Sequence, residues 1–211
     1  MALSESHFVC TEAEYRLNAA AGGSDQKANI QAALRDTTTY MERLIGRSIV
    51  SRGAVTEYHT IPFQSWRESI RLNQYPLLTL TSVHESCASP RVYDATTLLV
   101  NGTDYVYIAD TGEIRRLCSS ELTTWRWGYR AIKVVYTAGW AQADVPGELK
   151  RICLFAATSM LKESALQRWG VSAATDDQGN YQRFIGYLPP DQLQMLQSYA
   201  LEKYGRTGEA A

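Results

Sequence analysis

Hydrophobic residues at helical spacing mark the first quarter of the chain. Between Ser24 or Asp25 and Gly46, apolar side chains recur every three to four residues, which predicts a helix with one buried face. The positions on that face are Ile30, Ala33, Leu34, Thr37, Met41, Leu44 and Ile45. A shorter helix is predicted over Thr11–Ala21, because Thr11 and Glu14 have the spacing of a capping box.

From Ser48 to Tyr136 the pattern changes to an alternation of period two with β-branched and aromatic residues, which predicts strands. The Asn101-Gly102 pair between two such runs predicts a hairpin turn. The expected strands are Ala54–Ile61, Ser69–Leu72, Leu77–His84, Thr97–Val100, Thr103–Ile108, Glu113–Leu117 and Arg130–Tyr136. Short strands in a row, bracketed by helices, favour an antiparallel sheet.

The helical spacing returns after the turn Thr137-Ala-Gly-Trp140. Pro146 is suited to a first helical turn, so we expect a long helix from about Asp144 to Arg168. Its apolar stripe comprises Leu149, Ile152, Cys153, Ala156, Met160 and Leu161. Gly170–Gly186 is polar and irregular, which predicts a loop or mobile connector. A last helix is expected from Pro189 to Gly205, followed by a flexible tail.

These patterns together predict an α+β fold. We expect a helical bundle with an inserted antiparallel β-sheet or hairpin region and a C-terminal docking helix. The core would comprise residues 1–169, and residues 170–211 would form the connector loop and C-terminal arm.

Composition narrows the functional classes. The 211 residues of the chain carry a formal net charge of −1 and have 45% apolar side chains, which is ordinary for a globular protein. The charges are balanced in each third of the chain, so no basic tail for nucleic acid is expected. We expect neither a signal peptide nor a membrane span. Cys10, Cys87, Cys118 and Cys153 are interpreted as reduced, mostly buried thiols of a protein made in the cytoplasm.

Candidate catalysts are scarce. The three histidines are His7, His59 and His84, and no nucleophile elbow, phosphate loop, dinucleotide fingerprint or zinc-protease motif occurs. His84-Glu85 and Cys87 are close in sequence, but this set is too small for a zinc site. We therefore expect no enzyme, no metal and no cofactor.

One segment, Ile114–Lys133, concentrates positive charge among aromatic residues. Its five cations are Arg115, Arg116, Arg126, Arg130 and Lys133, and its only acid is Glu121. Such a mixture can hold phosphates and stack on bases, which makes these cations candidates for lining a DNA passage. The alternative, which we favour, is a sheet with aromatics on one face and solvated arginines on the other.

The predicted last helix has an apolar face that includes Leu193, Leu196 and Tyr204. This face either folds back on the body of the protein or docks in a groove of a partner. Tyr187, Tyr199 and Tyr204 suit an interface because they combine large area with a polar group.

Four segments in order give the chain a family resemblance. They are Tyr40–Ser48 (YMERLIGRS), Tyr75–Val83 (YPLLTLTSV), the turn NGTDY at Asn101 followed by TGEI at Thr111, and Val135–Leu149, which contains VYTAGW and a helix start at Val145-Pro146. On these segments the chain resembles the head–tail connector (adaptor or head-completion) proteins of tailed double-stranded DNA bacteriophages. The resemblance covers roughly Ala28–Met160.

The resemblance implies a structural virion protein without catalytic residues, made in the host bacterial cytoplasm. It would form a dodecameric ring at the phage neck, bind the portal protein, extend the channel for packaged double-stranded DNA and link the head to a downstream neck or tail protein. Portal docking is assigned by analogy to Leu188–Ala211, with Leu188, Leu193, Leu196, Tyr199 and Tyr204 as contact residues. The alternatives are a distal neck or tail-terminator protein, and a non-catalytic nucleic-acid-binding protein using Arg115–Lys133.

Overall fold

A computed structural model of the chain describes residues 5–18, 27–88, 91–165, 174–175, 181–182 and 188–200. The fold is α+β, as the sequence predicts. It consists of two compact units, which are described separately. The helical unit comprises Met1–Val50 and Ala141–Ala211, and the β-unit comprises Ser51–Trp140. The β-unit is therefore an insertion between two helical segments, as expected from the run of strands bracketed by helices.

The helical unit follows the predicted elements closely. Its helices are η1 (Glu5–His7), α1 (Glu12–Asn18), α2 (Lys27–Ile45), η2 (Gln142–Asp144), α3 (Gly147–Ala165) and α4 (Pro190–Ser198), and a short strand pair is formed by β8 (Ala174–Thr175) and β9 (Tyr181–Gln182). The capping box is confirmed, because Thr11 N–H donates to Glu14 Oε2 at 2.7 Å and Glu14 N–H donates to Thr11 Oγ1 at 3.1 Å. This exchange satisfies donors at the start of α1.

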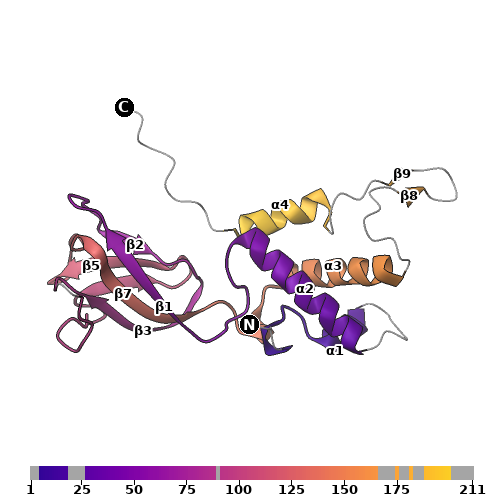
Figure 1. Ribbon diagram of the computed structural model, residues 1–211, viewed down its shortest axis with the longest axis horizontal. Helices are drawn as coiled ribbons and strands as arrows, with labels where there is room; N and C mark the ends of the chain where they lie inside the picture. The colour runs from indigo at the N-terminus through magenta and orange to yellow at the C-terminus, as the bar shows by residue number, and fades with distance from the viewer. Residues whose placement is uncertain are drawn as a thin grey trace. The chain divides into compact units, whose positions relative to one another are not determined.

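Helix α2 crosses both α3 and α4 and joins them into one body (Figure 1). Its buried residues include Ile30, Leu34 and Met41, from the predicted stripe. They face Leu149, Ile152 and the other buried positions of α3 within one apolar core. Helix α4 ends at Ser198 rather than at Gly205, because Tyr199 and Ala200 N–H groups bond three residues back and tighten the last turn.

The β-unit contains two antiparallel sheets where the sequence analysis expected one. The first sheet has the order β1 (Ala54–Ile61), β7 (Gly128–Ala138), β3 (Leu77–Glu85). The second has the order β2 (Ser69–Arg71), β5 (Glu113–Cys118), β4 (Tyr105–Ile108), and β6 (Glu121–Leu122) pairs with β5. Buried side chains from both sheets, including Val83, Ile114, Ile132 and Trp125, form a shared core. The sheets therefore pack as two layers.

The hairpin predicted around Asn101-Gly102 is wrong in its pairing. Residues 97–99 run beside β3, where Glu85 N–H donates to Thr97 O and Leu99 N–H donates to Val83 O. The next strand, β4, pairs with β5 instead. The turn between them is closed by Asp104, whose N–H donates to Val100 O and whose Oδ2 accepts from Val100 N–H at 2.8 Å. The Asn-Gly turn therefore passes the chain from one sheet to the other.

Candidate functional site

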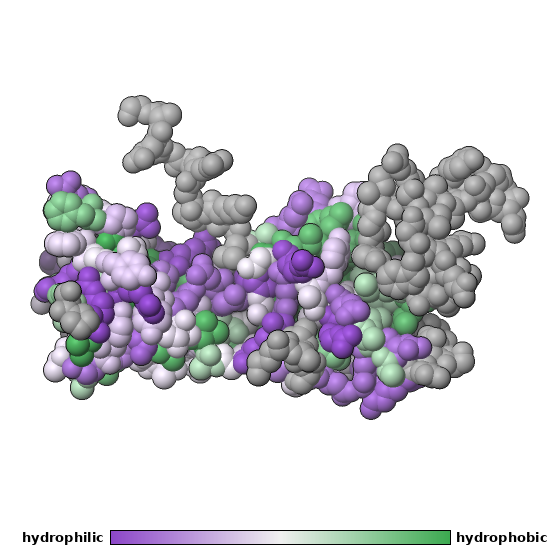
Figure 2. All heavy atoms as spheres, viewed as in Figure 1, coloured by the Kyte–Doolittle hydropathy of each residue, from purple (hydrophilic) through white to green (hydrophobic). Residues whose placement is uncertain are grey.

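A cluster of aromatic and basic side chains covers one region of the β-unit. We call it the basic–aromatic surface and define it by Tyr58, Phe63, Trp66, Arg67, Arg91, Tyr93, Arg126, Trp127, Tyr129, Arg130 and Lys133. Several of its aromatic rings are exposed, and Trp66, Tyr129, Phe63 and Trp127 reach exposed fractions of 84%, 74%, 67% and 61%. In the space-filling view, hydrophobic residues reach the surface of the β-unit between hydrophilic ones (Figure 2).

The pairing of β1 with β7 brings these residues together. Tyr58 lies opposite Lys133, and Ile61 lies opposite Gly128, so the end of β1 meets the start of β7. The loop after β1 then returns over the start of β7, where the rings of Phe63 and Trp127 meet edge to face with centroids 4.9 Å apart. This geometry is favourable for aromatic pairs.

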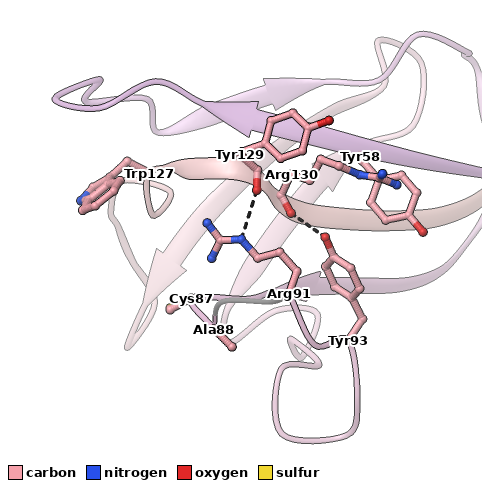
Figure 3. A pocket seen from close by; sticks show the side chains of 8 residues that line it. All are labelled: Tyr58, Cys87, Ala88, Arg91, Tyr93, Trp127, Tyr129 and Arg130. Carbon is pink, nitrogen blue, oxygen red and sulfur yellow. Dashed lines mark hydrogen bonds between the residues drawn. The ribbon is translucent and has the colours of Figure 1, made fainter.

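A groove of about 690 Å³ opens within this surface (Figure 3). It is lined by Tyr58, Cys87, Ala88, Arg91, Tyr93, Trp127, Tyr129 and Arg130. The Arg91 guanidinium is held by two backbone carbonyls, donating from Nε to Tyr129 O at 3.1 Å and from Nη1 to Ser86 O at 2.5 Å. Gly128 makes room for it, since a Cβ at this position would overlap Arg91 Nη2.

Two cations of the groove region stack on aromatic rings. The Arg130 guanidinium carbon lies 3.7 Å from the centroid of Tyr58, and Lys133 Nζ lies 5.5 Å from that of Tyr93. Tyr93 also donates its hydroxyl to Arg130 O at 2.5 Å, and burial raises the pKa of this phenol. Such contacts orient a cation without neutralising it, because a ring carries no formal charge.

The five basic side chains of this surface keep their charge unpaired. Within the described residues, no carboxylate forms an ion pair with Arg67, Arg91, Arg126, Arg130 or Lys133. Their other hydrogen bonds go to neutral groups, as when Arg126 Nη1 approaches Cys87 Sγ at 3.1 Å. The surface therefore presents positive charge and aromatic rings together.

The cations singled out in the sequence divide into two groups. Arg126, Arg130 and Lys133 belong to the basic–aromatic surface, whereas Arg115 is exposed elsewhere on β5 and pairs with Glu113 at 2.8 Å. Arg116 points to the opposite face and donates from Nη2 to the buried Glu85 Oε2 at 3.0 Å. Its charge is neutralised inside the β-unit. The proposed role of the five cations in facing DNA stays a prediction.

Sequence reasoning missed half of this surface. Tyr58, Arg67, Arg91 and Tyr93 lie far in sequence from Ile114–Lys133, and only the pairing of strands places them beside it. The preferred sequence interpretation, with aromatics on one face and arginines on the other, is too simple. Trp125 is buried and Trp127 is exposed, and rings and cations share the exposed side.

The predicted docking helix α4 packs on the helical unit. Leu188 and Leu196 are buried and Leu193 is half-buried, while Tyr204 lies outside the described residues. Buried Arg47 donates to Tyr199 O from Nη2 at 3.1 Å and from Nε at 3.3 Å. Tyr199 in turn donates its hydroxyl to Glu148 Oε2 at 3.1 Å. Burial and this carboxylate raise the pKa of Tyr199.

The remaining polar chemistry is structural. His84 Nδ1 lies 3.2 Å from Thr97 Oγ1, within the segment that runs beside β3. Cys10 and Cys153 are buried as expected, whereas Cys87 and Cys118 are exposed, and all four are free.

Among the described residues, no group of three His, Cys, Asp or Glu side chains is placed to hold a metal ion. In the same part of the chain, no helix combines the length and apolar character needed to cross a bilayer.

Comparisons with known proteins find likeness in structure alone. No family model matches the sequence, and no curated protein matches it. A chain from the neck of an empty gene transfer agent (GTA) particle, computed with C6 symmetry, superposes with a TM-score of 0.58 at 17% identity, covering 94% of this chain and 92% of that one.

Two further solved structures are similar. A chain from the neck of a native GTA particle, computed with C12 symmetry, has a TM-score of 0.55 at 15% identity and covers 89% of this chain and 86% of that one. A chain from the virion of a native GTA particle has a TM-score of 0.55 at 19% identity, with 82% and 90% covered. At these identities the likeness establishes the fold.

Proposed function

We propose that this chain is a structural protein of the neck of a tailed-phage-like particle, where it forms a homo-oligomeric ring. The observation that carries the proposal is the fold likeness to a chain from a GTA particle neck, which spans 94% of this chain. The ordered sequence segments from Tyr40 to Leu149 support the same assignment independently. The C6 and C12 symmetry of the neighbouring necks supports a ring.

Within the neck, we assign the chain the role of an adaptor on the portal. A dodecamer would extend the channel for packaged DNA and offer a platform for the next neck or tail protein. A protein divided into a helical unit and a β-unit has two separate surfaces for such neighbours. The sequence resemblance places portal docking on residues 188–211, at Leu188, Leu193, Leu196, Tyr199 and Tyr204. The protein would be made in the host cytoplasm and function in the virion without catalysing a reaction.

Burial of Leu188 and Leu196 restricts how this docking could occur. If α4 stays on α2, the portal must contact its outer side, where Gln194 and Gln197 are exposed. If α4 detaches, its apolar face becomes available, and docking is coupled to the rearrangement of a helix. Both routes keep the portal contact in the C-terminal segment.

Electron microscopy of the protein mixed with its portal tests the assignment. We expect an added ring on the portal, and the portal alone is the control. No added ring at high protein concentration would reject the adaptor role, whereas a ring bound only to an assembled tail would favour the distal neck or tail-terminator alternative. Removal of residues 188–211 should abolish docking, while removal of 201–211 alone separates the tail from α4. Circular dichroism must confirm that each variant is folded.

A second candidate function, non-catalytic nucleic-acid binding, is favoured by the unpaired cations of the basic–aromatic surface. Titration of duplex DNA at several salt concentrations tests it, because each phosphate contact releases counterions. If Arg126, Arg130 and Lys133 contact phosphates, the logarithm of the binding constant should fall with the logarithm of the salt concentration. The slope should be about −0.9 for each contact. Absence of binding at low salt would remove this candidate and leave the neck assignment unaffected.

A further inference from the structure

The exposed rings of the basic–aromatic surface call for a covering partner. Trp66, Trp127, Tyr129 and Phe63 each expose more than 60% of their area. Large contiguous apolar patches on a soluble protein commonly mark an interaction site, and Trp, Tyr and Arg are the side chains most enriched in interface hot spots. Arg91 and Arg130 are already fixed by carbonyl and ring contacts, so little side-chain freedom is lost when a partner binds.

The charge of the chain indicates which partner fits. The whole sequence has 21 Lys and Arg against 22 Asp and Glu. Without the five unpaired cations of the basic–aromatic surface, 16 basic and 22 acidic residues remain, a net charge of −6 for the rest of the chain. The nearby Asp94 accepts from Thr96 N–H and Oγ1 and does not pair with these cations. Outside its own basic–aromatic surface, a second copy therefore carries a net negative charge.

This distribution favours a head-to-tail contact. Two basic–aromatic surfaces facing each other would place ten unpaired cations together, and like charges in contact destabilise an interface. A contact between different surfaces of two copies is heterologous and closes into a ring when its rotation allows. Nucleic acid fits less well, because the chain has no basic track beyond this surface to follow a phosphate backbone.

The complementary surface lies in the longest stretch without Lys or Arg. Residues 92–114 contain four carboxylates and no basic side chain. This stretch exposes two aliphatic side chains and one carboxylate that we name the acidic–aliphatic surface: Val106, Ile108 and Asp110. Among the described residues, no basic side chain forms an ion pair with Asp110.

The two surfaces lie at opposite ends of β7. The basic–aromatic surface surrounds Gly128–Arg130, at the start of the strand. Ile108 and Asp110 lie at its other end, because Leu77 pairs with Ala138 and donates its N–H to Ala109 O at 2.8 Å. Ten residues of extended strand separate the ends by about 30 Å. The surfaces of one copy therefore do not meet each other and are available to neighbours on both sides.

We propose that the basic–aromatic surface of one copy binds the acidic–aliphatic surface of the next, and that this contact closes the ring. The proposal rests on the assigned ring function and specifies the contact that builds it. Trp127 and Tyr129 would cover Val106 and Ile108, while Arg126 and Arg130 would face Asp110.

Thiol cross-linking tests the contact with the full chain. Cys87 lines the groove and is exposed, whereas Cys10 and Cys153 are buried. In a C118S I108C chain, a bismaleimide should join Cys87 of one copy to position 108 of the next. A head-to-tail contact gives a ladder of dimers, trimers and larger species on a denaturing gel. The C118S chain without I108C is the control and should give monomer. If I108C does not fold, V106C replaces it at another exposed position.

The other outcomes overturn the proposal. Dimers in the C118S control would mean that two grooves face each other. No ladder at high concentration would remove the contact, and salt-dependent DNA binding lost in R130E would then reassign the surface to nucleic acid. Cross-linked ladders without a ring on the portal would retain the contact and reject the neck assignment. A ring on the portal without cross-linked ladders would retain the neck assignment and reject the contact.

Charge exchange provides a second, independent measurement. R130E and D110R should each weaken self-association by about tenfold in sedimentation, because each faces like charge in the neighbour. Combining R130E and D110R in one chain should restore association. A mixture of the two single variants should also associate, since the R130E surface faces the D110R surface and the two unchanged surfaces face each other. Failure of the double variant to recover would contradict the assigned pairing.

Discussion

Glu85 is a buried carboxylate of the β-unit that forms an ion pair with Arg116. Its buried carboxylate accepts from Arg116 at 3.0 Å and 3.2 Å through Oε2, and from Arg126 N–H at 2.8 Å through Oε1. Removing one partner of a buried pair leaves the other charge desolvated. We expect E85Q to lower the free energy of unfolding by about 3–5 kcal/mol, measured by urea denaturation.

The exposed pair Glu113–Arg115 is the matched control. Its two side chains keep exposed fractions of 26% and 45%, so solvent screens their attraction. E113Q should change the free energy of unfolding by less than about 1 kcal/mol. Equal losses of unfolding free energy in E85Q and E113Q would show that burial does not increase the contribution of Glu85 to stability.

Glu57 makes stability depend on pH. Burial raises the pKa of this carboxyl, but His59, the Tyr136 hydroxyl at 2.9 Å and Asn73 N–H outweigh burial, so its pKa lies below the ordinary value of 4.5. A depressed pKa contributes stability above pH 4.5 that is lost as pH falls through the folded-state pKa. Unfolding free energies from pH 7 downward should therefore decline below about pH 4.5 in the wild type and decline less in E57Q. Identical profiles would contradict this.

The side chains show where sequence reasoning stops at the residue scale. Arg115 and Arg116 are neighbours, and alternation along a strand predicts that they point to opposite faces. The partner that neutralises Arg116 is 31 residues away, and no local pattern identifies it. Alternation likewise does not separate buried Trp125 from exposed Trp127, since both have the same parity. Both lie between β6 and β7, outside any strand, where alternation does not apply.

At the scale of elements, Arg47 anchors the end of α4. It follows α2 directly, is buried and donates two hydrogen bonds to Tyr199 O. We expect R47A to increase hydrogen exchange of the α4 amides by about tenfold or more, because a charge-assisted hydrogen bond contributes about 1.5 kcal/mol or more. R43A, at an exposed position of α2, is the control. Unchanged exchange in R47A would mean that the buried side chains Leu188 and Leu196 hold the helix without Arg47.

Elements with strong local signals were predictable. The capping box, the apolar stripes of α2 and α3 and most strands appear where the periodicity places them. The pairing of the strands was not predictable. The backbone of Thr97–Val100 hydrogen-bonds to β3, whereas Tyr105–Ile108 pairs with β5. An Asn-Gly turn predicts a reversal of direction and does not fix the partners of its flanks. Sheet membership is a non-local property.

At the scale of the whole molecule, the chain divides into a helical unit and a β-unit. The expected boundary between 169 and 170 lies outside the described residues and stays a prediction. The division present separates Ser51–Trp140 from the two segments around it. The sequence indicated this insertion through the change of period from helical to alternating after Gly46 and back again after Trp140. It contained no local signal that both helical segments share one core, because that core is built from distant segments.

The insertion predicts that the β-unit folds alone. Its two ends lie side by side, since Ser51 N–H donates to Trp140 O at 2.9 Å, so excision breaks the chain at one place on its surface. Its core, including Trp125, Ile132 and Tyr136, is drawn from within residues 51–140. We expect a fragment of residues 51–140 to unfold cooperatively with denaturant, followed by the fluorescence of Trp125 in a W66F W127F W140F background. An E85Q fragment is the matched destabilised control. A fragment without a cooperative transition would show that the β-unit needs the helical unit in order to fold. The two units would then be compact in structure without being independent folding units.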